Sequence, residues 1–167
     1  MDKDKFTKTF KELLPYLITI VVILLFKQFL YCPVRVNGSS MYSTLKENDI
    51  MILNRIHYRF NDINRFDIVV VDAEDELLIK RVIGLPGEEI KYKNNKLYID
   101  GKKLDNKYGK GQTNDFVDYC QKGYYFVMGD NRTNSLDSRI LGSFKTKKLL
   151  GKTNYTIFPF SRFGKKE

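Results

Sequence analysis

The chain has 167 residues, 43% of them hydrophobic, which is enough for one domain's core and excludes wholesale disorder. Two cysteines and one histidine exclude a disulfide framework and a spaced metal cluster, and any zinc site or serine–histidine pair would have to use His57. The net charge of +9 suits anionic lipid or nucleic acid, but a solvated lysine-rich surface gives the same value. Charge alone therefore does not choose a function.

The N-terminal part contains the stretch "LLPYLITIVVILLFKQFLY", residues 13–31, whose first charge is Lys27. A helix needs about 20 mostly apolar residues to cross a membrane, so we predict a single transmembrane helix over 13–31. We predict that it stays uncleaved, because "LYCPV" lacks small residues at the spacing of a signal-peptide cleavage site. Lysines precede the span, which favours residues 1–12 in the cytoplasm and residues 33–167 outside.

After Pro33 the pattern changes to short β-like runs separated by turn residues. The runs are "VRVN", "DIMILNRI", "FDIVVVD", "ELLIKRVIG", the hairpin "IKYKNNKLYIDGKKL" that turns at Asn94-Asn95, "GYYFVMGDNRTNSLDSR" and "GKTNYTIFPF". Residues 102–122 are polar and lysine-rich, and we expect a surface excursion there. The sequence predicts one mainly β domain over 33–167, an antiparallel, barrel-like sheet closed or folded on itself to hide its edges.

A glycine-led turn, "NGSSMYSTLKENDI" at 37–50, places two serines side by side ahead of a strand. A serine hydroxyl is a poor nucleophile until a base removes its proton. His57 is a weak candidate for that base, because "RIHYRF" puts it between arginines with no carboxylate at a telling spacing. We expect His57 to be a surface or structural residue.

Lys80 is the second candidate base. It lies in "LLIKRVIGLPG", among apolar neighbours, whereas most other lysines have polar company. Burial lowers the pKa of a lysine, and the neutral amine can accept a proton. A strand-edge lysine that reaches out to water explains the same pattern, so the residues alone leave both interpretations open.

Several motifs in one order carry a family resemblance: "GSSMYSTL", "RFDIVVV", "KRVIGLPG", "GDNRTNSLDSR" and "IFPFSRFG". Together with the N-terminal span they resemble type I signal peptidase in its minimal Gram-positive form, the membrane-bound serine–lysine endopeptidase. The resemblance implies that the chain removes N-terminal signal peptides from exported proteins after small-x-small sites. It also implies preprotein substrates and membrane lipid as partners, with no cofactor, metal or nucleic acid.

The resemblance assigns roles to residues by their place in the motifs. The serine directly before the methionine, Ser40, matches the nucleophile, and Lys80 matches the general base that later protonates the departing amine. The supporting residues lie in one later loop: Ser135 matches a serine that orients the lysine, Asp137 and Arg139 match a bracing charged pair, and Asp130 lies beside them. The positions expected near the substrate or the oxyanion are Gly38, Ser39 and Met41.

Three positions depart from the family pattern. Gly38 stands where some members place a hydroxyl, which leaves the second oxyanion donor unidentified. Ser43 replaces the usual proline, a loss of rigidity expected to cost about 0.4–1 kcal/mol. Phe66 replaces the usual glycine. These departures favour a specialised member over an inactive one.

Three other functions compete with a general signal peptidase. A dedicated processing or assembly peptidase for a few surface proteins would explain Ser43. A non-catalytic, membrane-tethered binding module would explain the charge but not the order of the motifs. A self-cleaving repressor of the same chemistry needs an Ala-Gly or Cys-Gly bond, which the sequence lacks: the only alanine, Ala73, precedes Glu74, and Cys32 and Cys120 precede Pro33 and Gln121.

Overall fold

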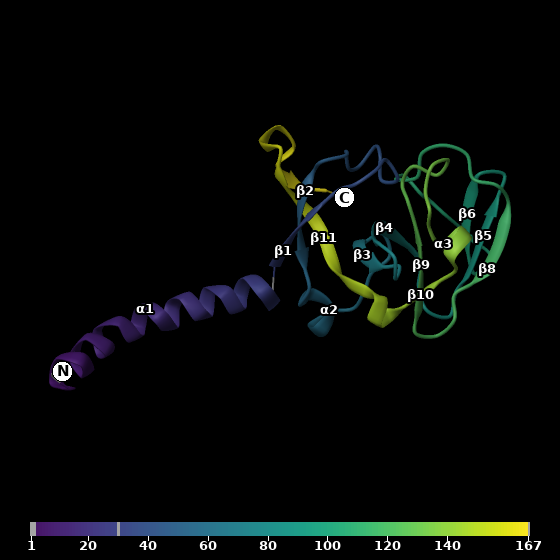
Figure 1. Ribbon diagram of the computed structural model, residues 1–167. Helices are drawn as coiled ribbons and strands as arrows, with labels where there is room; N and C mark the ends of the chain where they lie inside the picture. Colours follow the sequence, from purple (N-terminus) through teal and green to yellow (C-terminus); the bar gives the residue numbers. More distant parts are fainter. Residues whose placement is uncertain (1–2, 30, 167) are drawn as a thin grey trace.

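The computed structural model describes residues 3–29 and 31–166, an N-terminal helix followed by a β domain (Figure 1). The helix α1 (Lys3–Phe29) projects away from the domain, and β1 (Tyr31–Arg35) begins where the predicted span was to end. The predicted helix therefore extends too far, because Tyr31 already belongs to the extended segment "YCPVR". Proline disfavours helix at the residue before it, which fits an extended chain here.

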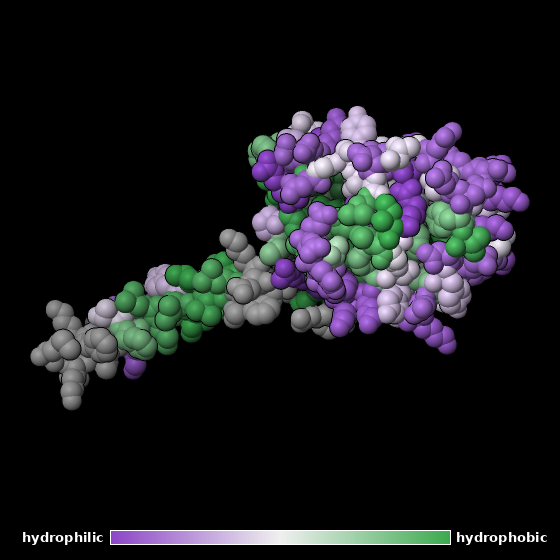
Figure 2. Space-filling model, turned by 45° about the vertical axis from the view of Figure 1, so that its right-hand side comes forward, coloured by the Kyte–Doolittle hydropathy of each residue, from purple (hydrophilic) through white to green (hydrophobic). Residues whose placement is uncertain are grey.

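Along α1 the apolar side chains between residues 9 and 24 are exposed, and they form the hydrophobic stretch of Figure 2. Most of the domain surface in this view is hydrophilic, with hydrophobic side chains gathered in small local patches. Within the described residues, no helix combines the length and apolarity required to span a membrane. The transmembrane span stays a prediction.

The larger sheet is antiparallel in all its pairs and has the order β1-β2-β11-β3-β4-β9-β10, with β12 on β11. Its further strands are β2 (Ile50–Asn54), β3 (Ile68–Asp72), β4 (Leu77–Gly84), β9 (Tyr124–Met128), β10 (Phe144–Lys145), β11 (Leu149–Phe158) and β12 (Gly164–Lys165). The β-branched run of β3 is buried from residue 68 to 71, which fits its central place between β11 and β4.

The smaller sheet has the order β7-β6-β5-β8 and lies at the end of the domain remote from α1 (Figure 1). Its strands are β5 (Glu89–Lys93), β6 (Lys96–Ile99), β7 (Lys102–Leu104) and β8 (Phe116–Tyr119). The predicted hairpin is confirmed: Lys93 pairs with Lys96, and Asn94 and Asn95 turn with φ of 51° and 59°.

The prediction of a surface excursion over 102–122 is wrong in part. β7 and β8 add two strands to the smaller sheet, and Cys120 is fully buried. Phe116 explains the ordering, because its ring stacks between Tyr92 and Phe126 at centroid distances of 5.3 and 5.8 Å. The prediction was wrong because it followed the lysine-rich composition and gave no weight to these few apolar residues.

The remaining elements are short turns of helix: α2 (His57–Phe60), α3 (Ser138–Leu141), and the 3₁₀ turns η1 (Thr146–Lys148) and η2 (Phe160–Arg162). The mainly β, antiparallel fold class is confirmed, and both cysteines are free thiols. One hydrophobic cluster lies under the serine-containing turn and is formed by Val36, Met41, Leu45, Met51 and Ile68. This cluster fixes the turn to the sheet that carries Lys80.

Candidate active site

The serine turn, residues 37–44, lies between β1 and β2. Gly38 has a φ of +79°, a left-handed conformation that glycine adopts without strain. Met41 is 1% exposed and packs into the cluster beneath the turn, while Ser40 remains half-buried. The methionine therefore holds the turn down, and the serine before it stays within reach of a substrate.

Ser40 Oγ lies 2.7 Å from Lys80 Nζ, although the two residues are forty positions apart. The distance falls within the range expected for a nucleophile and its base, about 2.6–3.2 Å. Lys80 projects from β4 and is 2% exposed, so its amine does not reach out to bulk water. Of the two interpretations that the sequence left open, the strand-edge lysine that reaches out to water is therefore excluded.

Burial is the main influence on Lys80 and lowers the pKa of its ammonium. The carboxylates of Asp137 and Glu76 act in the opposite sense, and the guanidinium of Arg139 lowers the pKa further. The net direction is downward, which favours the neutral amine that a proton acceptor requires.

The polar loop, residues 129–137, lies against the serine turn. The backbone N–H of Asn131 donates to the Ser40 carbonyl at 2.9 Å, and the Asn134 side chain donates to Ser39 Oγ at 2.9 Å. A side chain at Gly129 would overlap both Ser135 Oγ and the Ser40 carbonyl oxygen, so glycine is needed for this contact. Ser135 is thereby placed beside Ser40, with its hydroxyl buried.

Asp137 and Arg139 form a two-pronged ion pair, with Nε–Oδ1 and Nη2–Oδ2 distances of 2.9 Å each. Gly129 N–H donates to Asp137 Oδ2 at 2.9 Å, and Arg139 Nη1 donates to the Arg132 carbonyl at 2.8 Å. Burial alone would raise the pKa of Asp137, but the bonds from Arg139 and Gly129 bring it below its ordinary value. The pair therefore closes the polar loop with a carboxylate that stays charged.

Asp130 is part of a second, fully buried ion pair. Arg81 donates to it from Nε at 2.8 Å and from Nη2 at 2.6 Å, and Thr44 Oγ1 adds a bond of 2.6 Å. Asp130 thus ties the serine turn, through Thr44, to β4, through Arg81. Sequence reasoning did not assign a role to Arg81 or Thr44, although a second cation beside Lys80 in an apolar strand was a usable signal.

A cleft of about 420 Å³ opens beside Ser40 and Lys80. Its walls come from residues 33–37 on one side and 76–80 on the other, with Met41 and Val70 between them. Most of this lining is apolar, so Met41 shapes the cleft from below, as a buried residue.

The sequence also raised a histidine base, His57, and a metal site. His57 begins α2, and its backbone N–H donates to Asn54 Oδ1 at 2.9 Å. Across residues 3–29 and 31–166, no three His, Cys, Asp or Glu side chains gather closely enough to hold a metal ion.

Comparison with known proteins places this geometry in a family. The sequence model described as "Signal peptidase, peptidase S26" matches residues 9–158. This chain belongs to the signal peptidase family, peptidase S26. Its activity is that of a serine endopeptidase of the signal peptidase I class, and the family implies preproteins bearing signal peptides as substrates.

The relatives match over most of their length. The chain is 38% identical over 162 residues to signal peptidase I S of Bacillus subtilis, covering 89% of this chain and 88% of the relative. It is 34% identical over 178 residues to signal peptidase IB of Staphylococcus aureus, covering 92% and 93%. The crystal structure of a signal peptidase I from Enterococcus faecalis superposes with a TM-score of 0.50 at 34% identity, over 55% of this chain and 97% of that one.

Two departures from the family pattern have unusual backbones. Ser43 has a φ of +94° and Phe66 a φ of +70°, both in the left-handed region. Glycine suits such a φ, so Phe66 occupies its family position with some strain. Proline is fixed near −65°, so the expectation that proline at 43 would simply rigidify this same turn is wrong.

Proposed function

We propose that Ser40 is the nucleophile and Lys80 the general base of this signal peptidase. The observation that carries the proposal is the 2.7 Å contact between Ser40 Oγ and Lys80 Nζ, made by a lysine that is 2% exposed. A buried amine next to a half-buried hydroxyl supplies a base without a histidine or a metal.

The reaction follows from this contact. Lys80 accepts the hydroxyl proton as Ser40 Oγ attacks the scissile carbonyl, and the resulting ammonium gives a proton to the departing amine. Cleavage of the C–N bond leaves an ester on Ser40 and frees the mature protein. Water, deprotonated by the same lysine, then adds to the ester carbonyl, and the signal peptide leaves as Ser40 regains its proton.

The tetrahedral oxyanion needs donors that are already in place. Among the described residues, the backbone N–H of Ser40 donates to no protein acceptor, which leaves it available as one donor. Gly38 and Ser39 are exposed in the same turn, so their backbone can lie beside the oxyanion. Ser135, Asp137 and Arg139 act as positioning residues that hold the polar loop against Ser40 and Lys80.

The cleft supports specificity for small side chains. An extended substrate segment that lies between residues 33–37 and 76–80 would form main-chain hydrogen bonds there and place alternate side chains on the apolar lining. We therefore propose cleavage after a small-x-small site, with small side chains at the first and third positions against the apolar lining.

We place the enzyme at the cell membrane, attached through α1, with residues 1–12 cytoplasmic and the β domain outside. The exposed apolar side chains of α1 between residues 9 and 24 support attachment to lipid. Attachment would bring Ser40 and a membrane-inserted signal peptide together in two dimensions. Flotation of the chain with lipid vesicles, compared with a variant that lacks residues 1–30, tests this part.

The dyad is tested by cleavage of a small-x-small preprotein. Ser40→Ala and Lys80→Ala are each expected to lower kcat/KM by about 10³-fold or more, while His57→Gln and the exposed-lysine variant Lys122→Ala keep normal turnover. Normal turnover by Ser40→Ala or Lys80→Ala would refute the mechanism. A protein that floats with lipid but cleaves no preprotein would instead be the tethered binding module.

A dedicated processing peptidase is a second candidate, favoured by the left-handed backbone of Ser43 beside the nucleophile. A panel of unrelated preproteins separates the two candidates. Cleavage of most of the panel supports a general enzyme, and cleavage of one or two surface-protein precursors supports the dedicated one.

A further inference from the structure

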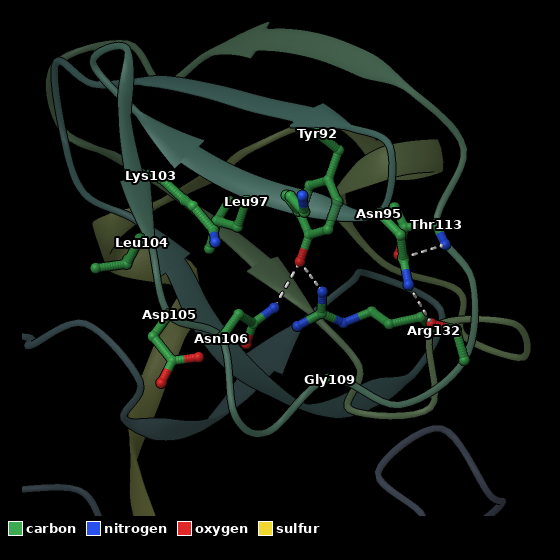
Figure 3. A pocket seen from close by; sticks show the side chains of 12 residues that line it. Tyr92, Asn95, Leu97, Lys103, Leu104, Asp105, Asn106, Gly109, Thr113 and Arg132 are labelled. Atoms are coloured by element: carbon green, nitrogen blue, oxygen red, sulfur yellow. Dashed lines mark hydrogen bonds between the residues drawn. The ribbon is translucent and has the colours of Figure 1, made fainter.

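A second cavity, of about 400 Å³, lies on the smaller sheet (Figure 3). It shares no lining residue with the cleft beside Ser40. Strand β6, strand β7 and residues 105–113 form its walls, and Arg132 of the polar loop enters from below Tyr92 in the view of Figure 3. We call it the small-sheet cavity.

Arg132 is 4% exposed, yet its guanidinium has no acidic partner in the part of the chain that the structure describes. It donates from Nε to the Gly129 carbonyl at 3.0 Å and from Nη1 to the Tyr92 hydroxyl. With its carbonyl oxygen turned toward Arg132, Asn106 accepts at 2.8 Å from both Nη atoms. None of the ion pairs within the described residues includes Arg132.

A buried cation without a counter-ion is costly, and proteins usually pair such groups. Gly109 lies flat against the guanidinium, where any side chain would overlap it, so the backbone is shaped around this arginine. The structure therefore maintains, at the wall of an accessible cavity, a positive charge that has no counter-ion within residues 3–29 and 31–166.

The rest of the lining adds positive charge and neutral hydrogen-bonding groups. Lys96 and Lys103 are exposed at the cavity, and Asp105 is the one carboxylate among its lining residues. Thr113 is 6% exposed, and its hydroxyl has no hydrogen-bond partner among the described residues. Three cations against one carboxylate, together with a free buried hydroxyl, make a site for an anion.

We propose that the small-sheet cavity binds a soluble, phosphate-sized oxyanion, with Arg132 as its buried ligand and Lys96 and Lys103 at its mouth. The bonds to Gly129, Tyr92 and Asn106 leave one N–H of Nη2 over, and this N–H can donate a charge-assisted hydrogen bond to a tetrahedral oxyanion. Strands β5, β6 and β7, which carry lining residues of the cavity, lie at the end of the domain remote from α1 (Figure 1), and this favours an anion from solution over a lipid headgroup. The inference does not depend on the peptidase mechanism.

Occupancy of the cavity would also affect the polar loop. Arg132 accepts a hydrogen bond from Arg139 through its carbonyl and donates to the Gly129 carbonyl through Nε. An anion that fixes the Arg132 side chain therefore restrains both ends of residues 129–139. Slower amide hydrogen exchange in this segment on phosphate binding is the expected consequence.

The test is calorimetric titration of the full chain in detergent with inorganic phosphate, at an ionic strength held constant with chloride. Saturable binding at one site is expected. Lys103→Ala should weaken it about three- to tenfold, whereas Lys102→Ala, an exposed neighbour on β7 that does not line the cavity, should leave it unchanged. Arg132→Lys keeps the charge but loses the contacts with Gly129, Tyr92 and Asn106 that hold it at the cavity wall, and should weaken binding by about tenfold or more.

Three results would overturn the proposal. One is the absence of saturable binding. Another is equal weakening by Lys102→Ala and Lys103→Ala, which would mean general attraction to a chain of net charge +9. A third is full affinity in Arg132→Lys. If that variant does not fold, Lys96→Ala compared with the exposed, non-lining Lys93→Ala repeats the comparison at the cavity mouth.

Discussion

Arg81 and Asp130 form a two-pronged ion pair with side chains that are 1% and 0% exposed. The pair joins the strand that carries the proposed base to the loop that braces the nucleophile. Thr44 extends it into the serine turn through a 2.6 Å bond to Asp130. Three segments that are far apart in sequence thus share one buried carboxylate.

Breaking this pair from one side should destabilise the fold strongly. Asp130→Asn removes the carboxylate charge that pairs with the buried Arg81 guanidinium, and loss of one partner of a buried pair costs about 3–5 kcal/mol. Urea denaturation measures the free energy of unfolding. Lys148→Ala breaks partly exposed pairs with Asp72 and Glu74, and should change this free energy little. An Asp130→Asn protein as stable as the parent would mean that the pair does not hold these segments together.

Ser43 is expected to prefer glycine over the proline of the family pattern. Its side chain is exposed and its φ is +94°, so Ser43→Gly removes strain without loss of packing and should stabilise the protein by about 1 kcal/mol. Ser43→Pro cannot adopt this φ and should both destabilise the protein and lower the cleavage rate. Thermal unfolding measures the stability of the two variants, and a cleavage assay measures their rates. A gain of stability in Ser43→Pro would contradict the turn geometry.

Local pattern predicted most of the architecture because the fold is built from short, clearly bounded strands. The β-branched run of β3, the Asn94-Asn95 hairpin and the apolar surroundings of Lys80 each carried their own signal. The end of α1 and strands β7 and β8 were misjudged, because a proline junction and a few aromatic anchors outweighed composition there.

The order of the motifs predicted which residues form the proposed site, but it could not predict their hydrogen-bond partners. The bond from Thr44 to Asp130 spans 86 positions, and the bond from Asn134 to Ser39 spans 95. Such contacts depend on how two loops pack, which no local pattern encodes. The Arg132 cavity was missed for the same reason, because its walls come from four separate segments.

Glu76 should shift the pH dependence of cleavage. Its carboxylate raises the pKa of Lys80 and so opposes the effect of burial. Because the neutral amine is the active form, kcat/KM rises as the pH passes the pKa of Lys80, and Glu76→Gln should move this rise to lower pH. Glu74→Gln, two positions away and exposed, is the matched control and should leave the profile in place. A shift toward higher pH in Glu76→Gln would contradict the proposed charge effect.

The buried amine of Lys80 should lower the stability of the folded protein. The pKa of its ammonium is lowered in the folded state, so between that pKa and the ordinary value the unfolded chain binds more protons than the folded one. Stability of the parent therefore rises with pH across this window, and the parent is at its least stable below the window. Lys80→Met fills the same apolar site without a charge, so it should be inactive and more stable than the parent at neutral pH.

The stability gap between Lys80→Met and the parent should narrow as the pH rises toward the ordinary pKa of lysine, because the parent then no longer loses stability through protonation of the unfolded chain. Urea denaturation at several pH values measures this gap, and Lys122→Met, at an exposed lysine, should show no such pH trend. A gap that is constant with pH would mean that Lys80 has an ordinary pKa in the fold. The amine would then be protonated at neutral pH, and it could not remove the proton of Ser40.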